Sequence, residues 1–344
     1  MTLQRLFGIE LPIIQAPMAG MQGGALAVAV SNAGGLGSLP CAMLGVDAMR
    51  RELAAIKAAS ASPFNVNFFC HTPPAQDPER EAAWRAALAP FYREYGIDPD
   101  ATAASPARAP FSTEAADVLD EFRPGVVSFH FGLPSEGLLE RARGWGSKIL
   151  SSATTLEEAR WLEAHGVDAV IAQGIEAGGH RGMFLTQDLS TQAGTLALVP
   201  QIVRAVKVPV IAAGGIADAK GVAAALALGA AGAQVGTAYL LCPEATTSPV
   251  HRAALKSEAA HHTALTNLFS GGHARGIVNR AMKALGPISN AAPPFPLASS
   301  AIAPLRAKAE SQGRGDFSPL WCGQNASGCK DMPAAELTRA LADV

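Results

Sequence analysis

The stretch DAVIAQGIEAGGHRG, residues 168–182, joins a short apolar run to a glycine-rich segment that carries a histidine. The apolar run predicts a buried strand, and Gln173 to His180 then follow its carboxyl end. Parallel α/β proteins place their reactive groups at this end of the sheet. Gly178 and Gly179 lack a Cβ, so the backbone there can adopt positive φ and approach a planar ligand, with His180 projecting over it. A glycine-rich turn with a solvated histidine is the alternative for this segment taken alone.

Apolar, β-rich runs recur along the whole chain. They predict strands at residues 11–16, 35–39, 64–69, 126–131, 148–152, 169–172, 208–213 and 233–235. The patterns between them predict helices at residues 24–32, 47–58, 135–143, 155–165, 195–206 and 218–228, with Thr155 and Asp218 as N-caps. Eight strands in series, separated by helices, are typical of a (β/α)8 TIM barrel, so the predicted fold class is α/β.

Two segments depart from this alternation. Residues 71–123 are too long for one crossover and predict an enlarged third connection, partly loop. Residues 248–285 carry a helical pattern, and residues 286–297 are rich in proline and are expected to be irregular. We therefore predict a barrel over residues 1–240. Residues 241–344 are expected to form a helical subdomain whose C-terminal segment returns to the barrel mouth.

The composition favours an enzyme that acts on a small molecule. Hydrophobic residues make up 49% of the 344 residues and charged residues 16%, which allows a large core. A formal net charge of -2 argues against nucleic acid or an anionic membrane as a partner. The sequence shows neither a signal-peptide pattern nor an apolar stretch of about 20 residues, so a cytoplasmic location is expected. Five cysteines without CxxC spacing favour reduced thiols over disulfides, and no metal site is predicted.

Two glycine-containing strand ends predict a phosphate-binding cradle. PVIAAGGI at residues 209–216 combines a strand, a glycine pair and a helix start, and GAQVGT at residues 232–237 ends a strand in glycine and threonine. In barrels, the loops after strands seven and eight bind phosphate through backbone N–H groups and a helix N-terminus. APMAG at residues 16–20, together with Asn67, offers further polar or backbone groups at the same end.

Seven motifs follow one another along the chain: PIIQAPMAG (12–20), NAGGLG (32–37), FNVN (64–67), VSFHFG (127–132), QGIEAGGHRG (173–182), GG (214–215) and QVGT (234–237). In this order they resemble the nitronate monooxygenases, formerly called 2-nitropropane dioxygenases. The resemblance resumes at LWCGQ, residues 320–324. SFHFG and EAGGHRG are similar in particular to the subgroup that works without NAD(P)H.

The resemblance implies an FMN-containing barrel that oxidises alkyl nitronates, with propionate 3-nitronate as a candidate, and some nitroalkanes. His180 matches the family's catalytic base. His130, at the end of the fourth strand, is expected to face the mouth in a substrate-anion or flavin role, and a hydrogen-bonded structural histidine is the alternative. The predicted cofactor-binding residues are Gln15, Ala16, Pro17, Met18, Asn67, Gln173, Gly178, Gly179, Gly214, Gly215, Gln234, Val235, Gly236, Thr237, Trp321 and Gln324. The expected reaction is one-electron oxidation of the nitronate by FMN, after which O2 converts the radical to a carbonyl compound and nitrite.

Several alternatives stay open at this point. The chain could be an NAD(P)H-dependent quinone or enoyl-thioester reductase of the same flavin superfamily, a binding protein without turnover, or a barrel enzyme for a sugar phosphate. His180 can act as a base for a neutral nitroalkane or as an imidazolium that holds an anionic nitronate. The oligomeric state is left open.

The roles of individual residues near the predicted mouth also differ. Arg181 could position an anion or pair with a surface acid, and His71 could belong to the site or to a loop. Glu176 is expected to order its loop, and Cys70 to be a buried, inert thiol. Residues 245–311 contain no tyrosine, which argues against an aromatic wall around the substrate.

Overall fold

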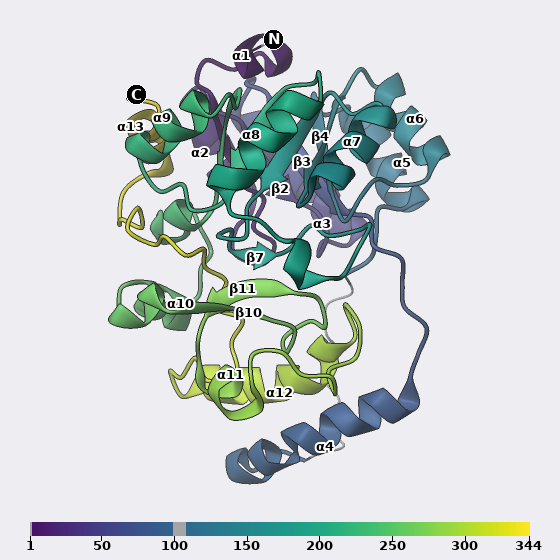
Figure 1. Cartoon of the computed structure of the whole chain (residues 1–344), viewed down its shortest axis with the longest axis vertical. Coiled ribbons are helices and arrows are strands. Elements are labelled where there is room, and N and C mark those ends of the chain that lie inside the picture. The colour runs from purple at the N-terminus through teal and green to yellow at the C-terminus, as the bar shows by residue number, and fades with distance from the viewer. Residues whose placement is uncertain (1, 99–107) are drawn as a thin grey trace.

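Eight parallel strands form a closed barrel in a computed structural model that describes residues 2–98 and 108–344 (Figure 1). The strands run in the order β1-β9-β8-β6-β5-β4-β3-β2, and a bridge between Ile14 and Leu36 joins β1 to β2. The predicted TIM-barrel fold is confirmed, and each predicted strand overlaps an observed one. The strands are β1 (Ile13–Gln15), β2 (Gly37–Pro40), β3 (Phe64–Phe69), β4 (Val126–His130), β5 (Lys148–Ala153), β6 (Ala169–Gln173), β8 (Val210–Ala213) and β9 (Gly232–Val235).

Helices cover the outside of the barrel, and one short helix packs its side chains among the buried strand residues. The outer helices are α2 (Gly24–Asn32), α3 (Val46–Ala59), α5 (Thr113–Phe122), α6 (Glu136–Gly144), α7 (Leu156–Ala164), α8 (Thr195–Ala205), α9 (Ala219–Ala227) and α13 (Ala334–Leu341). The side chains of Leu3 and Phe7, from α1 (Leu3–Phe7), pack among buried strand residues such as Ile211. The predicted N-caps are confirmed, because Thr155 Oγ1 accepts from the Glu158 amide and the Asp218 carboxylate accepts from the Gly221 amide.

A second hydrophobic core lies beyond the mouth of the barrel. There α4 (Pro78–Tyr95), from the enlarged connection, packs against α12 (Ala298–Ser311), at the opposite end of Figure 1 from the barrel. Buried Trp84 donates from Nε1 to the Ala298 carbonyl at 3.1 Å, across 214 residues of sequence. The enlarged connection therefore contributes a helix to this second core. Its alanine- and proline-rich part, residues 99–107, lies outside the described residues.

The helical prediction for residues 248–285 is wrong in its middle. The segment begins with α10 (Pro249–Leu255) and the short 3₁₀ helix η3 (Glu258–His261), and it ends with α11 (Arg280–Leu285). Between them, β10 (Thr263–Thr266) and β11 (Ala274–Ile277) pair antiparallel, and β11 also pairs with β7 (Gly179–His180). Short apolar runs do not distinguish helix from strand, and here pairing with a distant segment decides.

The proline-rich segment that follows α11 is irregular. Residues 286–297 contain no helix or strand, as predicted. Two further 3₁₀ helices, η1 (Leu189–Thr191) and η2 (Thr237–Leu241), follow the loops at the barrel mouth. None of the described helices combines the length and apolar character needed to cross a bilayer.

Candidate active site

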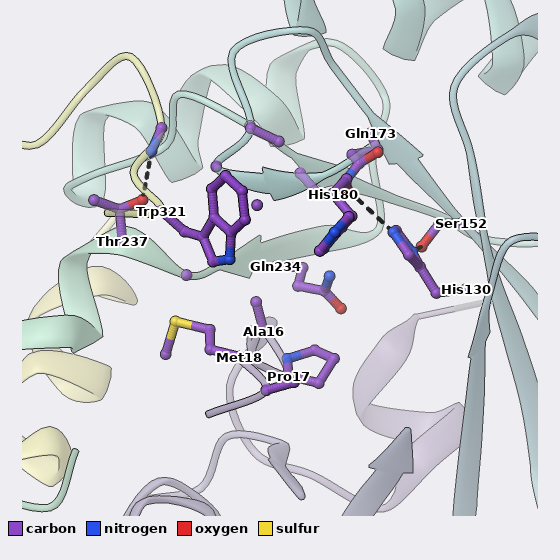
Figure 2. A pocket seen from close by; sticks show the side chains of 18 of the residues that line it. Ala16, Pro17, Met18, His130, Ser152, Gln173, His180, Gln234, Thr237 and Trp321 are labelled. Carbon is purple, nitrogen blue, oxygen red and sulfur yellow. Dashed lines mark hydrogen bonds between the residues drawn. The ribbon is translucent and has the colours of Figure 1, made fainter. Parts of the chain in front are cut away.

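A pocket opens at the carboxyl ends of the barrel strands (Figure 2). Its empty volume is about 1280 Å³, which includes solvent space at the open mouth. Figure 2 shows His180 and Trp321 on one side, facing Ala16, Pro17 and Met18. Most of the predicted site residues line it: Ala16, Pro17, Met18, Asn67, His130, Gln173, Gly178, Gly179, His180, Gly214, Gly215, Gln234, Gly236, Thr237 and Trp321.

Three residues of the predicted set do not line the pocket. Gln15 is fully buried behind it, where its Oε1 accepts from the Ser38 amide at 3.0 Å. Val235 packs in the core outside the barrel, and its carbonyl accepts from the Ala16 amide at 2.8 Å. The side chain of Gln324 is exposed, although its amide donates to the Glu176 carbonyl at 2.9 Å. These three residues thus support the pocket from behind or beside it.

His180 is held in the wall of the pocket by pairing in the small sheet. Its neighbour across the register is Ala274 of β11, and its Nε2 lies 2.8 Å from Ser270 Oγ. The His180 ring also contacts the rings of Phe295 and Trp321, with centroid distances of 5.1 and 5.4 Å. The backbone and the ring are therefore both fixed, so His180 is preorganised.

Burial and positive neighbours keep the imidazole of His180 neutral. Desolvation is the largest cause that lowers its pKa well below the usual 6.5, followed by Arg108, His130 and His71. A neutral imidazole can accept a proton, whereas an imidazolium cannot. In this site, the electrostatics favour the base over the imidazolium form that the sequence left open.

His130 and Gln173 hold the backbone of His180 from behind. His130 Nε2 lies 3.1 Å from the His180 carbonyl and its Nδ1 lies 3.1 Å from Ser152 Oγ, while burial lowers its pKa to about 4. Since a carbonyl only accepts, the proton of neutral His130 is on Nε2. Gln173 donates from Nε2 to the same carbonyl at 2.9 Å, and its Oε1 accepts from the Gly182 amide at 2.8 Å. Both side chains are engaged within the protein.

The cradle predicted after β8 and β9 has the backbone geometry that only glycine adopts readily. Gly214 and Gly215 have φ values of +120° and +72°. A Cβ on Gly214 would lie 2.9 Å from Thr195 Oγ1, so this position is packed too closely for a larger residue. Across the cradle, Thr237 Oγ1 accepts from the Gly323 amide at 2.9 Å, which ties the C-terminal segment to the mouth.

One buried acceptor in this region has no partner within the described residues. Gln234 lines the pocket beside the cradle, and its Oε1 is buried without a hydrogen bond. A buried, unpaired amide oxygen is costly, so it indicates a ligand that donates a hydrogen bond there.

Arg181 takes neither of the two roles expected for it. Its side chain is 1% exposed and donates to the carbonyls of Gly174 and Gln173, at 2.6 and 2.7 Å, and to Gln192 Oε1. Adjacent residues of an extended strand point to opposite sides, so Arg181 points behind the loop when His180 faces the pocket. Arg181 therefore stabilises the loop from inside the protein.

The expectations for Glu176 and Cys70 are supported. The Glu176 carboxylate accepts from the amide and from the hydroxyl of Thr195, both at 2.8 Å, so it orders the loop against the start of α8. Burial raises the pKa of the Cys70 thiol, which makes it inert as a nucleophile. All five cysteines are free, and the described residues contain no cluster suited to a metal ion.

An aromatic wall surrounds His180 despite the missing tyrosines. Phe295 comes from the segment in which no wall was expected, and its ring contacts those of Phe69, Phe131 and His71. Phe69 could have been recognised from sequence, because it lies two residues after Asn67 on one strand and so shares its face. His71 belongs to this aromatic cluster.

Several lining residues were missed by sequence reasoning. Ser152 and Ile171 lie on barrel strands, where alternation could have indicated them. Arg108 comes from the enlarged connection, which offers neither a motif nor a periodicity. The missed lining residues are Ala19, Met21, Met43, Phe69, Arg108, Ser152, Ile171, Ala177, Ala213, Ile216, Leu240, Gly323 and Asn325.

A closed α/β barrel with a glycine cradle and a half-buried histidine at its mouth defines a barrel enzyme that binds its ligands at the carboxyl ends of the strands. The family model for nitronate monooxygenase matches residues 1–343, and the chain belongs to this family.

Relatives and a solved structure agree over nearly the full chain. The chain is 43% identical over 348 residues to a nitronate monooxygenase of Pseudomonas aeruginosa, covering 98% of this chain and 97% of the relative. It is 44% identical over 340 residues to one of Paraburkholderia phytofirmans, covering 98% and 92%. The structure of a nitroalkane oxidase from Streptomyces ansochromogenes matches with a TM-score of 0.88 and 38% identity, over 99% of this chain and 96% of that one.

Proposed function

We propose that this protein oxidises alkyl nitronates, and some nitroalkanes, with FMN and O2 to a carbonyl compound and nitrite. The observation that carries the proposal is the half-buried His180, whose pKa is lowered, in the same pocket as the glycine cradle after β8 and β9. The names of its relatives and its family support the substrate class. Propionate 3-nitronate is a candidate substrate.

The pocket suits FMN in two respects. Gly214 and Gly215, with Thr237 beside them, would hold the phosphate through backbone N–H groups and a hydroxyl. The buried, unpaired Oε1 of Gln234 would accept from the ring system, and residues 16–18 would line it. When bound, FMN would supply electron transfer and the chemistry with O2.

The residues of this chain would handle the substrate proton. A general base must be unprotonated to take the proton from the carbon next to a nitro group, and the lowered pKa of His180 keeps its ring in that neutral form. Ser270, at 2.8 Å from Nε2, would keep the ring oriented during this step. His130 and Gln173 would act as positioning residues, since both bind the His180 carbonyl. The surrounding phenylalanine rings would exclude water.

The test compares two forms of one substrate in the variant His180→Asn. For neutral nitroethane, loss of the base should lower kcat/KM by about 10²–10⁴-fold. For preformed ethyl nitronate, which has already lost the proton, the decrease should be much smaller. Oxygen consumption and nitrite release give both rates, and the visible flavin spectrum confirms that the cofactor is retained. Unchanged turnover of nitroethane would remove His180 from the proposed role.

A further inference from the structure

Arg108 places a guanidinium in the pocket from an unexpected direction. It belongs to the connection after β3, and it lines the pocket together with Phe69 and His180. In the order of the closed barrel, β3 and β8 are four strands apart on either side, so they lie across the barrel from one another. Arg108 therefore approaches from the side opposite to the glycine cradle after β8.

One nitrogen of the Arg108 guanidinium has no partner among the described residues. This nitrogen, Nη1, is also buried. Burial and the nearby Arg306 lower its pKa, and Arg108 in turn lowers the pKa values of His71 and His180. A buried N–H group without an acceptor is costly, and an anion that enters the pocket would supply the acceptor.

Other arginines near the pocket are already bound. Arg181 donates to the Gly174 and Gln173 carbonyls, and Arg275 donates to the Ile175 carbonyl at 2.8 Å. The cradle on the far side would take the cofactor phosphate. An anion at Arg108 would therefore come from the substrate.

We propose that Arg108 is the anion-binding and specificity-determining residue of the substrate pocket, where its planar guanidinium holds a planar, two-oxygen anion of the substrate. This inference rests on the proposed function for the identity of the substrate. A nitronate and a carboxylate share this shape and charge, and both match the fork of an arginine. Lysine, a point charge, matches it less well.

Anion binding at Arg108 is also coupled to the protonation of His180. The groups that act on His180 are Arg108, His130 and His71, all of them cationic or able to become so. An anion bound to Arg108 cancels part of this positive field and so favours proton uptake by His180. Removal of the Arg108 charge likewise raises the pKa of His180 in the empty site. The acid limb of the pH profile for nitroethane therefore moves to higher pH in Arg108→Met.

The experiment uses the holoenzyme with Arg108→Met, Arg108→Lys and the control Arg50→Met. Arg50 is a surface residue paired with Glu121, so its replacement matches the change in net charge. The substrates are neutral nitroethane, propyl-1-nitronate and propionate 3-nitronate, and propionate serves as an unreactive ligand in calorimetric titration. In Arg108→Met, the KM of an anionic substrate should rise about 10- to 100-fold, with a smaller change in kcat. Arg108→Lys should recover part of the loss, and Arg50→Met should match wild type.

The pattern of effects identifies the anion. An equal rise in KM for both nitronates supports contact with the nitronate oxygens, and a rise confined to propionate 3-nitronate supports contact with the carboxylate. If wild type binds propionate through Arg108 but turns over no nitronate, the anion site stands and the proposed function fails. If Arg108→Met retains a folded, flavin-loaded pocket with unchanged KM values and unchanged propionate affinity, the inference is overturned.

Discussion

Glu176 and His180 lie four residues apart on one loop, yet their surroundings differ. The Glu176 carboxylate is saturated by the backbone amide and hydroxyl of Thr195, at the start of α8, whereas His180 faces the pocket. Glu176 therefore stabilises the loop, and His180 is free to react. The chemistry of each side chain follows from what its polar atoms already bind.

The variant Glu176→Gln tests this division of roles. The substitution removes a negative charge that interacts favourably with the positive N-terminal end of α8, and it weakens the hydrogen bonds to Thr195. The free energy of unfolding should therefore fall by about 1–2 kcal/mol. The control Glu157→Gln, an exposed acid in the first turn of α7, should change stability by less than about 0.5 kcal/mol. Urea denaturation measures both. Nitronate turnover should stay within a few fold, and a collapse of kcat without loss of stability would show a catalytic Glu176.

Among the site residues, those that belong to a motif at the end of a strand could be predicted from the sequence. His180, Gly214 and Gly215 were found because they follow buried strands. The role of Arg181 was left open between two alternatives, and the structure shows neither, because the sequence does not reveal that this side chain points behind the loop and binds main-chain carbonyls. No sequence pattern indicated that Arg108 lines the pocket, because the direction of a side chain in an irregular connection cannot be predicted from the sequence.

The elements around the mouth depend on close contact between two backbone segments. Gly178 in the β6–β7 loop packs directly on the C-terminal segment that carries Trp321, where a Cβ would lie 2.5 Å from the Gly323 nitrogen and 2.6 Å from the Cys322 carbonyl carbon. Gly179 has a φ of +71°, but a Cβ there would meet nothing within 4 Å. One glycine is required by packing and its neighbour by backbone conformation.

These neighbouring glycines give a matched pair of variants. Gly178→Ala should lower the unfolding free energy by about 2–4 kcal/mol and release flavin, because the C-terminal segment must move. Gly179→Ala should cost only the strain of its positive φ, about 1–2 kcal/mol, with the flavin retained. Urea denaturation and the flavin content of the purified proteins measure both effects. Equal losses in the two variants would contradict the packing argument.

Element prediction failed where distant segments decide the structure. Strand β11 is flanked by β10 and β7, so its conformation is set by residues almost 100 positions earlier in the chain as well as by its neighbours. The packing of α4 on α12 was not predictable, because no local pattern encodes that pairing. The barrel strands were predictable because each forms part of a repeated local alternation.

At the scale of the whole molecule, buried neutral histidines make stability depend on pH. His251 is 1% exposed, its Nε2 lies 3.0 Å from the Trp321 carbonyl, and burial lowers its pKa to about 4. His130 has a pKa of about 4 for the same main reason. Above pH 6.5 these residues are neutral in both states. Below pH 6.5 these histidines bind protons in the unfolded chain but stay neutral in the folded protein. The free energy of unfolding therefore falls as the pH drops toward 4.

The size of this effect can be measured at two pH values. From pH 7 to pH 5, His251 alone should remove about 2 kcal/mol from the unfolding free energy. The variant His251→Gln keeps a side-chain donor but cannot titrate, so the loss between the two pH values should shrink by about that amount. Urea denaturation of both proteins at each pH gives the difference. An identical loss in wild type and variant would exclude His251 as a contributor.

The proposed function requires that a nitronate, and not a nicotinamide, delivers electrons in this pocket. The most direct measurement is anaerobic mixing of the purified flavin-loaded protein with a nitronate and, separately, with NADH and NADPH, while the visible absorption spectrum is recorded. We expect rapid reduction of the flavin by the nitronate and an unchanged spectrum with either nicotinamide. Rapid bleaching by NADH or NADPH, with no response to the nitronate, would contradict the proposed function and favour a reductase.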